Sequence, residues 1–256
     1  MGSFKDSISK IRKSWMGPST DSSAASSPAR SPTTSPPLHA GTFSYYDDEP
    51  LPPISLHGYM PTTKNRLLTP EMCDEIRNLM PTRVQLYTDW HLLYSLEQFG
   101  ASLHSLYANV MPSSKLTRRV GYVLVIKDRK GSIFGAYANE PFHPTDSRRY
   151  YGNGECFLWK MEKVPNVILG DQSSTHEKTR HKWRFKGYPY TGLNEFVIYC
   201  TSEFLSMGAG DGHYGLWCDD GLVNGVSDPS LTFGNEVLSR EGNKFHIVGL
   251  EVWRVG

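Results

Sequence analysis

The chain has 256 residues, a hydrophobic fraction of 38% and a formal net charge of +1 at pH 7. This length suffices for one sizeable domain with a tail, and the near-neutral charge gives no global indication of nucleic-acid binding. No apolar run approaches the roughly 18 residues of a membrane span, and no secretory signal opens the chain. The four cysteines lie far apart without a C-x-x-C pair, which argues against a zinc site and a disulfide framework. We therefore expect a reducing, cytoplasmic setting.

Residues 1–17 have the pattern of a short basic amphipathic helix. One face would carry Phe4, Ile8, Ile11 and Trp15, while lysine and arginine occupy the other positions. Such a helix could lie on an anionic membrane or dock in a partner groove, but isolated helices of this length are marginal in water. A mitochondrial presequence is the alternative, although Asp6 counts against it.

Residues 18–60 are predicted to be a disordered linker. Its first half consists mostly of Ser, Thr and Pro, which cannot bury enough apolar surface to offset the entropy of ordering. Ser27, Ser31 and Ser35 are each followed by proline and are the phosphorylation candidates. Phosphorylation there would add charge and could control where an adaptor protein goes.

Three helices are predicted at the start of the folded region, which we expect to span 61–256. Thr69 suits the N-cap of the first helix, and Pro81 ends it. The apolar face of that helix would comprise Met72, Ile76 and Leu79. A second helix is predicted over residues 89–99, before Gly100, and a third over residues 102–110.

Strand patterns dominate the rest of the chain. Both faces of residues 120–126 are apolar, which predicts a strand covered on each side. Further apolar runs fall at residues 132–138, 156–161, 196–200, 214–218, 222–226 and 245–255. Turn residues rather than helices separate them, which favours antiparallel pairing. The polar stretch 170–182 is predicted to be a surface loop.

The segment 195–220 organises this β region. Gly208, Gly210, Gly212 and Gly215 crowd between two apolar runs, which predicts strand, glycine loop, strand. Glycine permits backbone angles closed to other residues and close approach by a neighbour, so we expect something pressed against this loop. The run G-A-G-D-G is no phosphate loop, because it lacks the lysine and does not open a helix.

Several spaced motifs resemble the TLDc domain family, over essentially the whole folded part. They are W-x-x-L-Y-S-L at 90–96, F-G-A at 134–136, YYGNGECFLWK at 150–160, SMGAGDGHYGLW at 206–217 and LEVW at 250–253. The resemblance implies an α+β sandwich of two packed antiparallel sheets with flanking helices, and no catalytic centre. It also implies a role in oxidative-stress survival and binding to the vacuolar-type proton-pumping ATPase, whose disassembly or inhibition fungal members favour.

A few residues of the chain could carry catalysis or bind a metal. Cys156 beside Glu155 could act as a thiol that removes peroxide, but its acidic neighbour and apolar strand favour a buried, inert thiol. Glu251 and Glu155 are expected to be structural carboxylates that accept hydrogen bonds from turn amides. Five histidines, at 143, 176, 181, 213 and 246, lack the spacing of a ligand set, so no metal or cofactor is expected.

The partner-binding candidates follow from the glycine turns, which present backbone and carboxylate together. They are Asn153, Glu155, Gly208, Gly210, Asp211, Gly212 and His213. The resemblance implies as partners the cytosolic-sector and peripheral-stalk subunits of the proton pump. We expect a monomeric cytoplasmic protein that is recruited to the vacuolar membrane, and in part a mitochondrial one.

Overall fold

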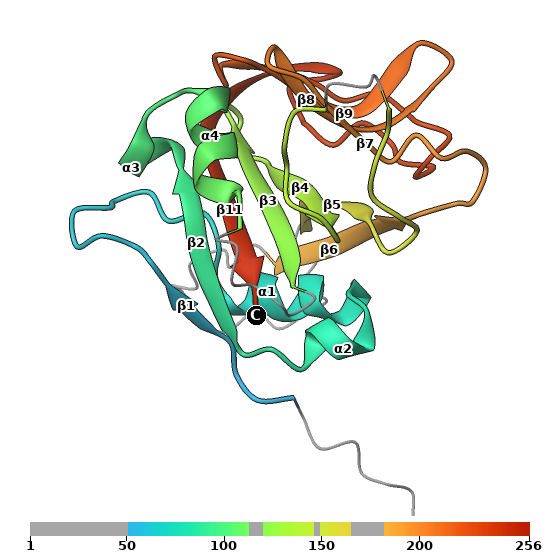
Figure 1. Ribbon diagram of the computed structural model, residues 1–256. Coiled ribbons are helices and arrows are strands. Elements are labelled where there is room, and N and C mark those ends of the chain that lie inside the picture. Colours follow the sequence, from blue (N-terminus) through green and yellow to red (C-terminus); the bar gives the residue numbers. More distant parts are fainter. Residues whose placement is uncertain (1–50, 113–119, 146–148, 165–181) are drawn as a thin grey trace, which may run out of the picture. The chain divides into compact units, whose positions relative to one another are not determined.

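The chain divides into two units, residues 1–48 and 49–256. The computed structural model describes residues 51–112, 120–145, 149–164 and 182–256, all of which lie in the larger unit. In these ranges antiparallel strands predominate and a few short helices flank them (Figure 1). This arrangement confirms the predicted α+β sandwich.

The helices begin where their capping residues place them. In α1 (Pro70–Leu79), the Thr69 hydroxyl accepts a hydrogen bond from the Met72 amide at 3.4 Å. In α4 (Leu103–Val110), the Ser102 hydroxyl accepts from the Ser105 amide at 3.2 Å. Two single-turn helices, α2 (Thr82–Gln85) and α3 (Leu96–Phe99), complete the helices of the described ranges. The first and third predicted helices are confirmed.

One long strand, β11 (Lys244–Val255), belongs to both sheets. The first sheet has the order β1 (Ser55–His57), β2 (Asp89–Ser95), β11, β3 (Gly121–Asp128), β4 (Ile133–Ala138), β5 (Phe157–Val164), β6 (Lys182–Pro189). The second has the order β11, β10 (Asn224–Val226), β9 (His213–Asp219), β8 (Phe204–Gly210), β7 (Ile198–Cys200). Neighbouring strands are antiparallel, except that β1 and β2 are parallel.

Two hydrophobic clusters lie on opposite faces of the first sheet. The cluster between the sheets includes Leu124, Phe134, Leu158, Met207, Leu216 and Phe245. The cluster under α1 includes Cys73, Ile76, Trp90, Val123, Trp159 and Trp253. Alternate residues of β3 enter each cluster, so the strand is buried on both faces, as its uninterrupted apolar sequence predicts.

Several sequence predictions are wrong. Residues 89–95 form strand β2 and only Leu96–Phe99 is helical, so the predicted helix over 89–99 does not exist. The predicted linker 18–60 overlaps the fold, because Ser55–His57 form β1. Leu79 is 40% exposed and is not part of the buried face of α1. The predicted loop 170–182 lies outside the described residues, except that Lys182 opens β6.

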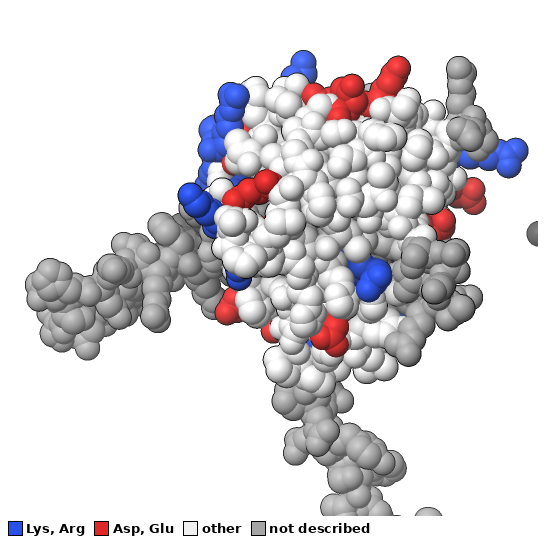
Figure 2. All heavy atoms as spheres, turned by 60° about the vertical axis from the view of Figure 1, so that its left-hand side comes forward, with Lys and Arg blue, Asp and Glu red and all other residues white. Residues whose placement is uncertain are grey.

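The face of the larger unit that carries β2 and α3 holds few charged side chains (Figure 2). Met60 and Phe99, which are 45% and 40% exposed, belong to this part of the chain. Gln98, the residue before Phe99, holds the Met60 backbone, since its side-chain oxygen accepts a hydrogen bond from the Met60 amide at 2.9 Å. Single exposed apolar residues are ordinary on protein surfaces, so they do not by themselves mark a site.

Candidate functional site

The glycine segment forms a β-hairpin with an exposed tip. Pairing of β8 with β9 ends at Gly210 and His213, which leaves Asp211 and Gly212 as a two-residue turn. Their φ angles are 52° and 80°. Positive φ at both central residues is the requirement of a type I′ turn, for which Asp-Gly is a preferred pair. Asp211, Gly212 and His213 are exposed, so the tip presents a carboxylate on a turn of defined geometry.

Gly208 lies inside β8 and not in a loop, which corrects the prediction of a long glycine loop. Its φ is 71°, and a Cβ there would lie 2.6 Å from the Phe233 ring and 2.8 Å from the Ser230 hydroxyl. No side chain larger than hydrogen fits without movement of these neighbours. The expected close approach is therefore present, and the segment that presses on the strand is the one containing Ser230 and Phe233.

A buried threonine holds the hairpin to the neighbouring loops. The Thr232 hydroxyl accepts from the Ala209 amide at 3.0 Å and lies 2.8 Å from the Asn194 side-chain oxygen. Asn194 in turn donates from Nδ2 to the Ala209 carbonyl at 3.0 Å. Neither residue is predictable from sequence, because a threonine and an asparagine in polar loops carry no distinctive signal. Their bonds fix the base of the hairpin while its tip stays exposed.

The turn around Asn153 is organised by two asparagines. The Asn153 side-chain oxygen accepts from the Glu155 amide at 2.9 Å, and the Asn139 side-chain oxygen accepts from the Asn153 amide at 3.1 Å. Tyr151 at the start of the turn pairs with Ile198 of β7. The hairpin contacts the same strand, since β8 pairs with all three residues of β7. Both predicted binding turns therefore rest on β7.

The Glu155 carboxylate forms a salt bridge with an arginine. Arg83, which belongs to α2, donates from both terminal nitrogens to Glu155 at 2.6 Å and 2.5 Å. This two-point contact is the strong geometry for an arginine and a carboxylate. It fastens α2 to the glycine turn. The sequence predicted turn amides as donors to Glu155, whereas the donor in this contact is the Arg83 side chain.

The Cys156 thiol lies in an unreactive environment. The side chain is buried, and its sulfur donates to the Asn139 side-chain oxygen at 3.0 Å. Burial raises the pKa of the thiol to about 11, so it is protonated at neutral pH. Because the thiolate is the nucleophile, this environment disfavours reaction with peroxide.

The remaining cysteines are buried, and the histidines noted in the sequence have local partners where they are described. Cys73, Cys200 and Cys218 are free and buried. Nδ1 of His213 lies 3.6 Å from the Asp228 carboxylate, and Nδ1 of His246 lies 3.0 Å from Glu241. His143 packs on Tyr151, and His176 and His181 lie outside the described residues. Within those described, no three His, Cys, Asp or Glu side chains gather as metal ligands.

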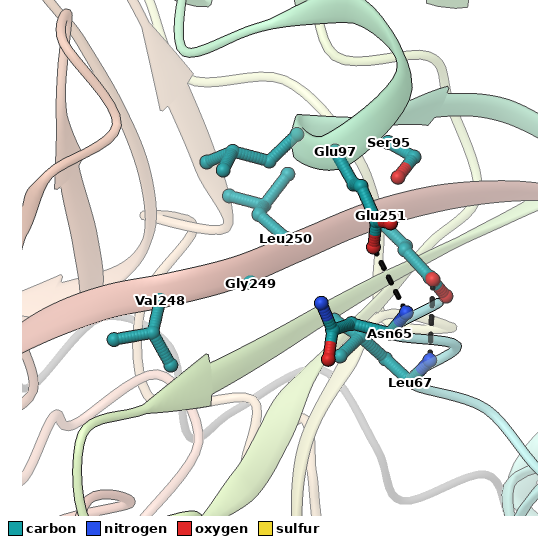
Figure 3. Close-up of a pocket in the computed structure, with 9 residues that line it drawn as sticks. Asn65, Leu67, Ser95, Glu97, Val248, Gly249, Leu250 and Glu251 are labelled. Atoms are coloured by element: carbon teal, nitrogen blue, oxygen red, sulfur yellow. Dashed lines mark hydrogen bonds between the residues drawn. The ribbon is translucent and has the colours of Figure 1, made fainter. Parts of the chain in front are cut away.

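Glu251 is a buried carboxylate beside a pocket of about 200 Å³ (Figure 3). It accepts hydrogen bonds from the Tyr59 hydroxyl at 2.9 Å, the Leu67 amide at 3.2 Å and the Trp253 indole at 2.9 Å. Burial raises its pKa, while the bonds from Trp253, Leu67 and Tyr59 act in the opposite direction. The sequence predicted an amide of a glycine turn as the donor to Glu251, and this is wrong, because the amide that it accepts from belongs to Leu67.

Two side chains of α3 hold the loop before Leu67. The Glu97 carboxylate accepts from the amides of Lys64 and Asn65 at 2.8 Å and 2.9 Å. The Gln98 oxygen accepts from the Thr63 hydroxyl at 2.6 Å. Figure 3 shows Glu97 and Glu251 reaching the loop at Asn65 and Leu67. Both carboxylates accept hydrogen bonds from amides of this loop. We therefore interpret the pocket as a structural feature and not as a ligand site.

The remaining site predictions lie outside the described residues. They are the membrane-contact candidates Phe4, Ile8, Ile11 and Trp15 and the phosphorylation candidates Ser27, Ser31 and Ser35. None of the helices in the described ranges has the length and the apolar character that a membrane span requires.

The fold and its turns define a class of protein: a two-sheet domain that exposes supported hairpins and buries its described cysteines. The family model of the TLDc domain matches residues 61–256. The chain belongs to the TLDc domain family, as its motifs predict.

Curated relatives resemble the chain over most of its length. Oxidation resistance protein 1 of Saccharomyces cerevisiae is 60% identical, with 100% of both chains covered. The protein of the same name from Kluyveromyces lactis is 69% identical over 83% of this chain and 84% of its own. That from Candida glabrata is 63% identical over 82% of this chain and 84% of its own.

Proposed function

We propose that this chain is a non-enzymatic regulator in oxidative-stress resistance, and that it acts by binding the vacuolar-type proton-pumping ATPase. In this proposal it captures the cytosolic sector and peripheral stalk and promotes their disassembly or inhibition. The first part rests on relatives named oxidation resistance protein at 60% identity or more. The second rests on the expectation that TLDc members bind this pump.

The observation that carries the proposal is the exposed Asp211-Gly212 turn on a buried support. Ala209 is held by Thr232, and Gly208 is covered by Phe233, so the base of the hairpin cannot shift easily. A preorganised turn loses little conformational entropy when a partner covers it, which favours binding. Binding of a large partner needs such a surface and no reacting group.

The thiol-enzyme alternative has no comparable support. It requires an accessible thiolate at Cys156, and that side chain is 1% exposed. Its pKa of about 11 leaves only a trace of thiolate at neutral pH. We therefore expect Cys156→Ser to leave protection against peroxide unchanged, and loss of protection with the fold intact would restore this alternative.

Promotion of disassembly requires a difference in affinity. A ligand shifts an equilibrium only toward the state that it binds more tightly. The protein must therefore bind the detached cytosolic sector more tightly than the assembled pump. A preference of one hundredfold corresponds to about 2.7 kcal/mol, which lies within the usual range of coupling free energies.

The test replaces the carboxylate at the hairpin tip. Asp211 has a φ of 52°, which asparagine tolerates and lysine does not, so Asp211→Asn removes the charge without straining the turn. We expect weaker binding to the purified detached sector and an unchanged melting temperature. Glu75→Gln, at an exposed position of α1, is the matched control. Equal binding by wild type and Asp211→Asn would remove the hairpin tip from the interface.

The location of the protein follows from the same proposal. We propose a cytoplasmic protein that is recruited to the vacuolar membrane through the pump, with residues 1–17 as an additional membrane contact or a mitochondrial signal. A peptide of residues 1–17 that fails to bind anionic vesicles would remove the membrane contact. Phosphorylation at Ser27, Ser31 or Ser35 would control where the domain is located in the cell. Alanine at all three positions should therefore abolish any stress-dependent change of location.

A further inference from the structure

Six aromatic side chains form a continuous group on the second sheet and the turn beside it. We name this group the aromatic face; it consists of Tyr150, Phe196, Tyr199, Phe204, Tyr214 and Trp217. Successive ring centroids lie 4.7–6.1 Å apart. Such spacings are those of rings in contact, so the six side chains make one surface.

The register of the strands shows that this surface points away from the core. Tyr199 of β7 pairs with Ser206 of β8, which pairs with Trp217 of β9. Directly paired residues project from the same face of a sheet. Their neighbours Leu205 and Cys218 are buried in the cluster between the sheets. Tyr199 and Trp217 therefore lie on the outer side of the sheet, and ring contacts connect the other four side chains to them.

The aromatic face remains open to solvent. Phe196 is 43% exposed, and the other five rings are half-buried. Among the described residues, the hydroxyls of Tyr150, Tyr199 and Tyr214 make no hydrogen bond, although buried tyrosines of this chain such as Tyr94 do. Tyrosine and tryptophan are the residues most enriched at the centres of protein interfaces. The face thus has the composition of an interface and unused donors.

The stretch of sequence that supplies five of the six aromatic residues carries charge of one sign. No Lys or Arg occurs between residues 187 and 239, a stretch that contains seven acidic residues. Glu195 and Glu203 directly precede Phe196 and Phe204, and both are exposed. In the described ranges neither forms an ion pair with a Lys or Arg.

Two basic residues of the described ranges lie beside the aromatic face. Arg149 precedes Tyr150, and Lys244 begins β11. Lys244 lines a hollow of about 310 Å³ together with Trp217, Val226 and His246. The hollow extends the aromatic face toward β11, where the acidic stretch has ended.

We propose that the aromatic face docks a Lys- and Arg-rich segment of a partner protein. Cations bind over aromatic rings, and the exposed carboxylates of Glu195 and Glu203 supply complementary charge. The inference goes beyond the proposed function, because it states the chemistry of a partner segment without requiring that the partner be the pump. Anionic lipid and nucleic acid would be repelled by the same carboxylates, and so would this face of a second copy.

A defined probe tests the inference with the full chain. It is a synthetic amphipathic helix with one leucine face and one face of lysine and arginine; its control carries glutamate in place of every basic residue. We expect the protein to bind the basic peptide in a salt-sensitive manner and not the acidic one. Binding to neither peptide, or to both equally, would overturn the inference.

Variants locate the probe on the surface. Phe196→Ala with Tyr199→Ala should weaken peptide binding about tenfold, as expected for central interface aromatics. Glu195→Gln with Glu203→Gln should weaken it at low salt and reduce its salt dependence. Leu86→Ala, at a site 66% exposed and remote from these strands in sequence, is the control and should change nothing. Unchanged binding by both double variants, with folding verified by thermal melting, would refute the proposal.

The other occupants have their own signatures. If the protein binds vesicles of anionic lipid and the aromatic variants do not, the occupant of the face is lipid and not a basic segment. If the protein forms a dimer and these variants are monomeric, the occupant is a second copy of the chain. The fate of the proposed function is separable. If the wild-type protein binds the pump sector but not the basic peptide, only the proposal for the aromatic face is contradicted. If the wild-type protein binds the basic peptide but not the pump sector, only the proposed binding to the pump is contradicted.

Discussion

Glu251→Ala should destabilise the domain strongly, because it removes the acceptor of two buried donors. The Trp253 indole donates to this carboxylate at 2.9 Å and the Leu67 amide at 3.2 Å, and the two residues are 0% and 5% exposed. A buried donor left without a partner costs about 1–3 kcal/mol, so the pair predicts a loss of about 2–6 kcal/mol. Domains have a total stability of about 5–15 kcal/mol, so this is a large fraction.

The assay is urea unfolding of the purified full chain, followed by tryptophan fluorescence. Glu97→Ala is the matched control, because Glu97 also accepts two amides of this loop but is accessible to water. Water replaces the lost acceptor there, so we expect a much smaller shift of the unfolding midpoint. Equal shifts for Glu251→Ala and Glu97→Ala would refute the reasoning that burial of these donors sets the cost.

The pH dependence of the same position has a definite sign. Burial raises the pKa of Glu251 above its ordinary value of 4.5, so the folded state binds the proton more tightly than the unfolded state. The resulting stabilisation is fully present below that ordinary value and is lost as pH rises through the folded pKa. Wild type should therefore gain stability relative to Glu251→Gln as pH falls from neutral. A relative loss on acidification would show that the hydrogen bonds outweigh burial.

Three further predictions concern other parts of the domain. Gly208→Ala should lower stability by about 1–3 kcal/mol, because the φ of 71° is strained for alanine, and a melting temperature equal to that of wild type would contradict the tight packing. Cys156 should react with a thiol reagent only after unfolding, and rapid labelling of the native protein would show an accessible thiolate. Lys186, Tyr188 and Lys160 lower the pKa of Glu236 to about 2, so the ionised carboxylate stabilises the fold of the wild type, and this stabilisation is lost as pH falls from the ordinary value of 4.5. Glu236→Gln should therefore make stability depend less on pH in this acid range. The effect is small because the Glu236 side chain is 47% exposed, and an unchanged acid profile would place the loss elsewhere.

Elements with strong local signals were predictable from sequence. Thr69 and Pro81 bound α1 because capping and proline chemistry act within one turn. The uninterrupted apolar run of β3 indicates burial on both faces, and both faces are buried. In each case the deciding interaction involves residues that are close in sequence or a pattern that burial imposes.

The missed strand β2 shows why the remainder was not predictable. Leu92 pairs with Trp253 and Tyr94 pairs with Val252, so Leu93 is an extra residue that breaks the register. A bulge of this kind interrupts the period-two alternation, and the apolar run then resembles a helix. Only the pairing with β11, more than 150 residues later in the chain, decides the strand.

The hairpin was predicted only in part for a related reason. The Asp211-Gly212 pair carries a local turn signal, and the crowded glycines obscured it. The support by Asn194 and Thr232 depends on loops that meet only in the folded chain. The aromatic face likewise forms only in the folded chain, since its six residues are spread over residues 150–217 and share no sequence period.

The most direct test of regulation by binding is a pair of affinities. Purified protein is titrated into the detached cytosolic sector of the vacuolar-type proton pump and into the assembled pump, under one buffer and one nucleotide condition. We predict tighter binding to the detached sector, and a shift of the assembly equilibrium toward disassembly that corresponds to that difference in affinity. Equal affinities, or tighter binding to the assembled pump, would contradict it.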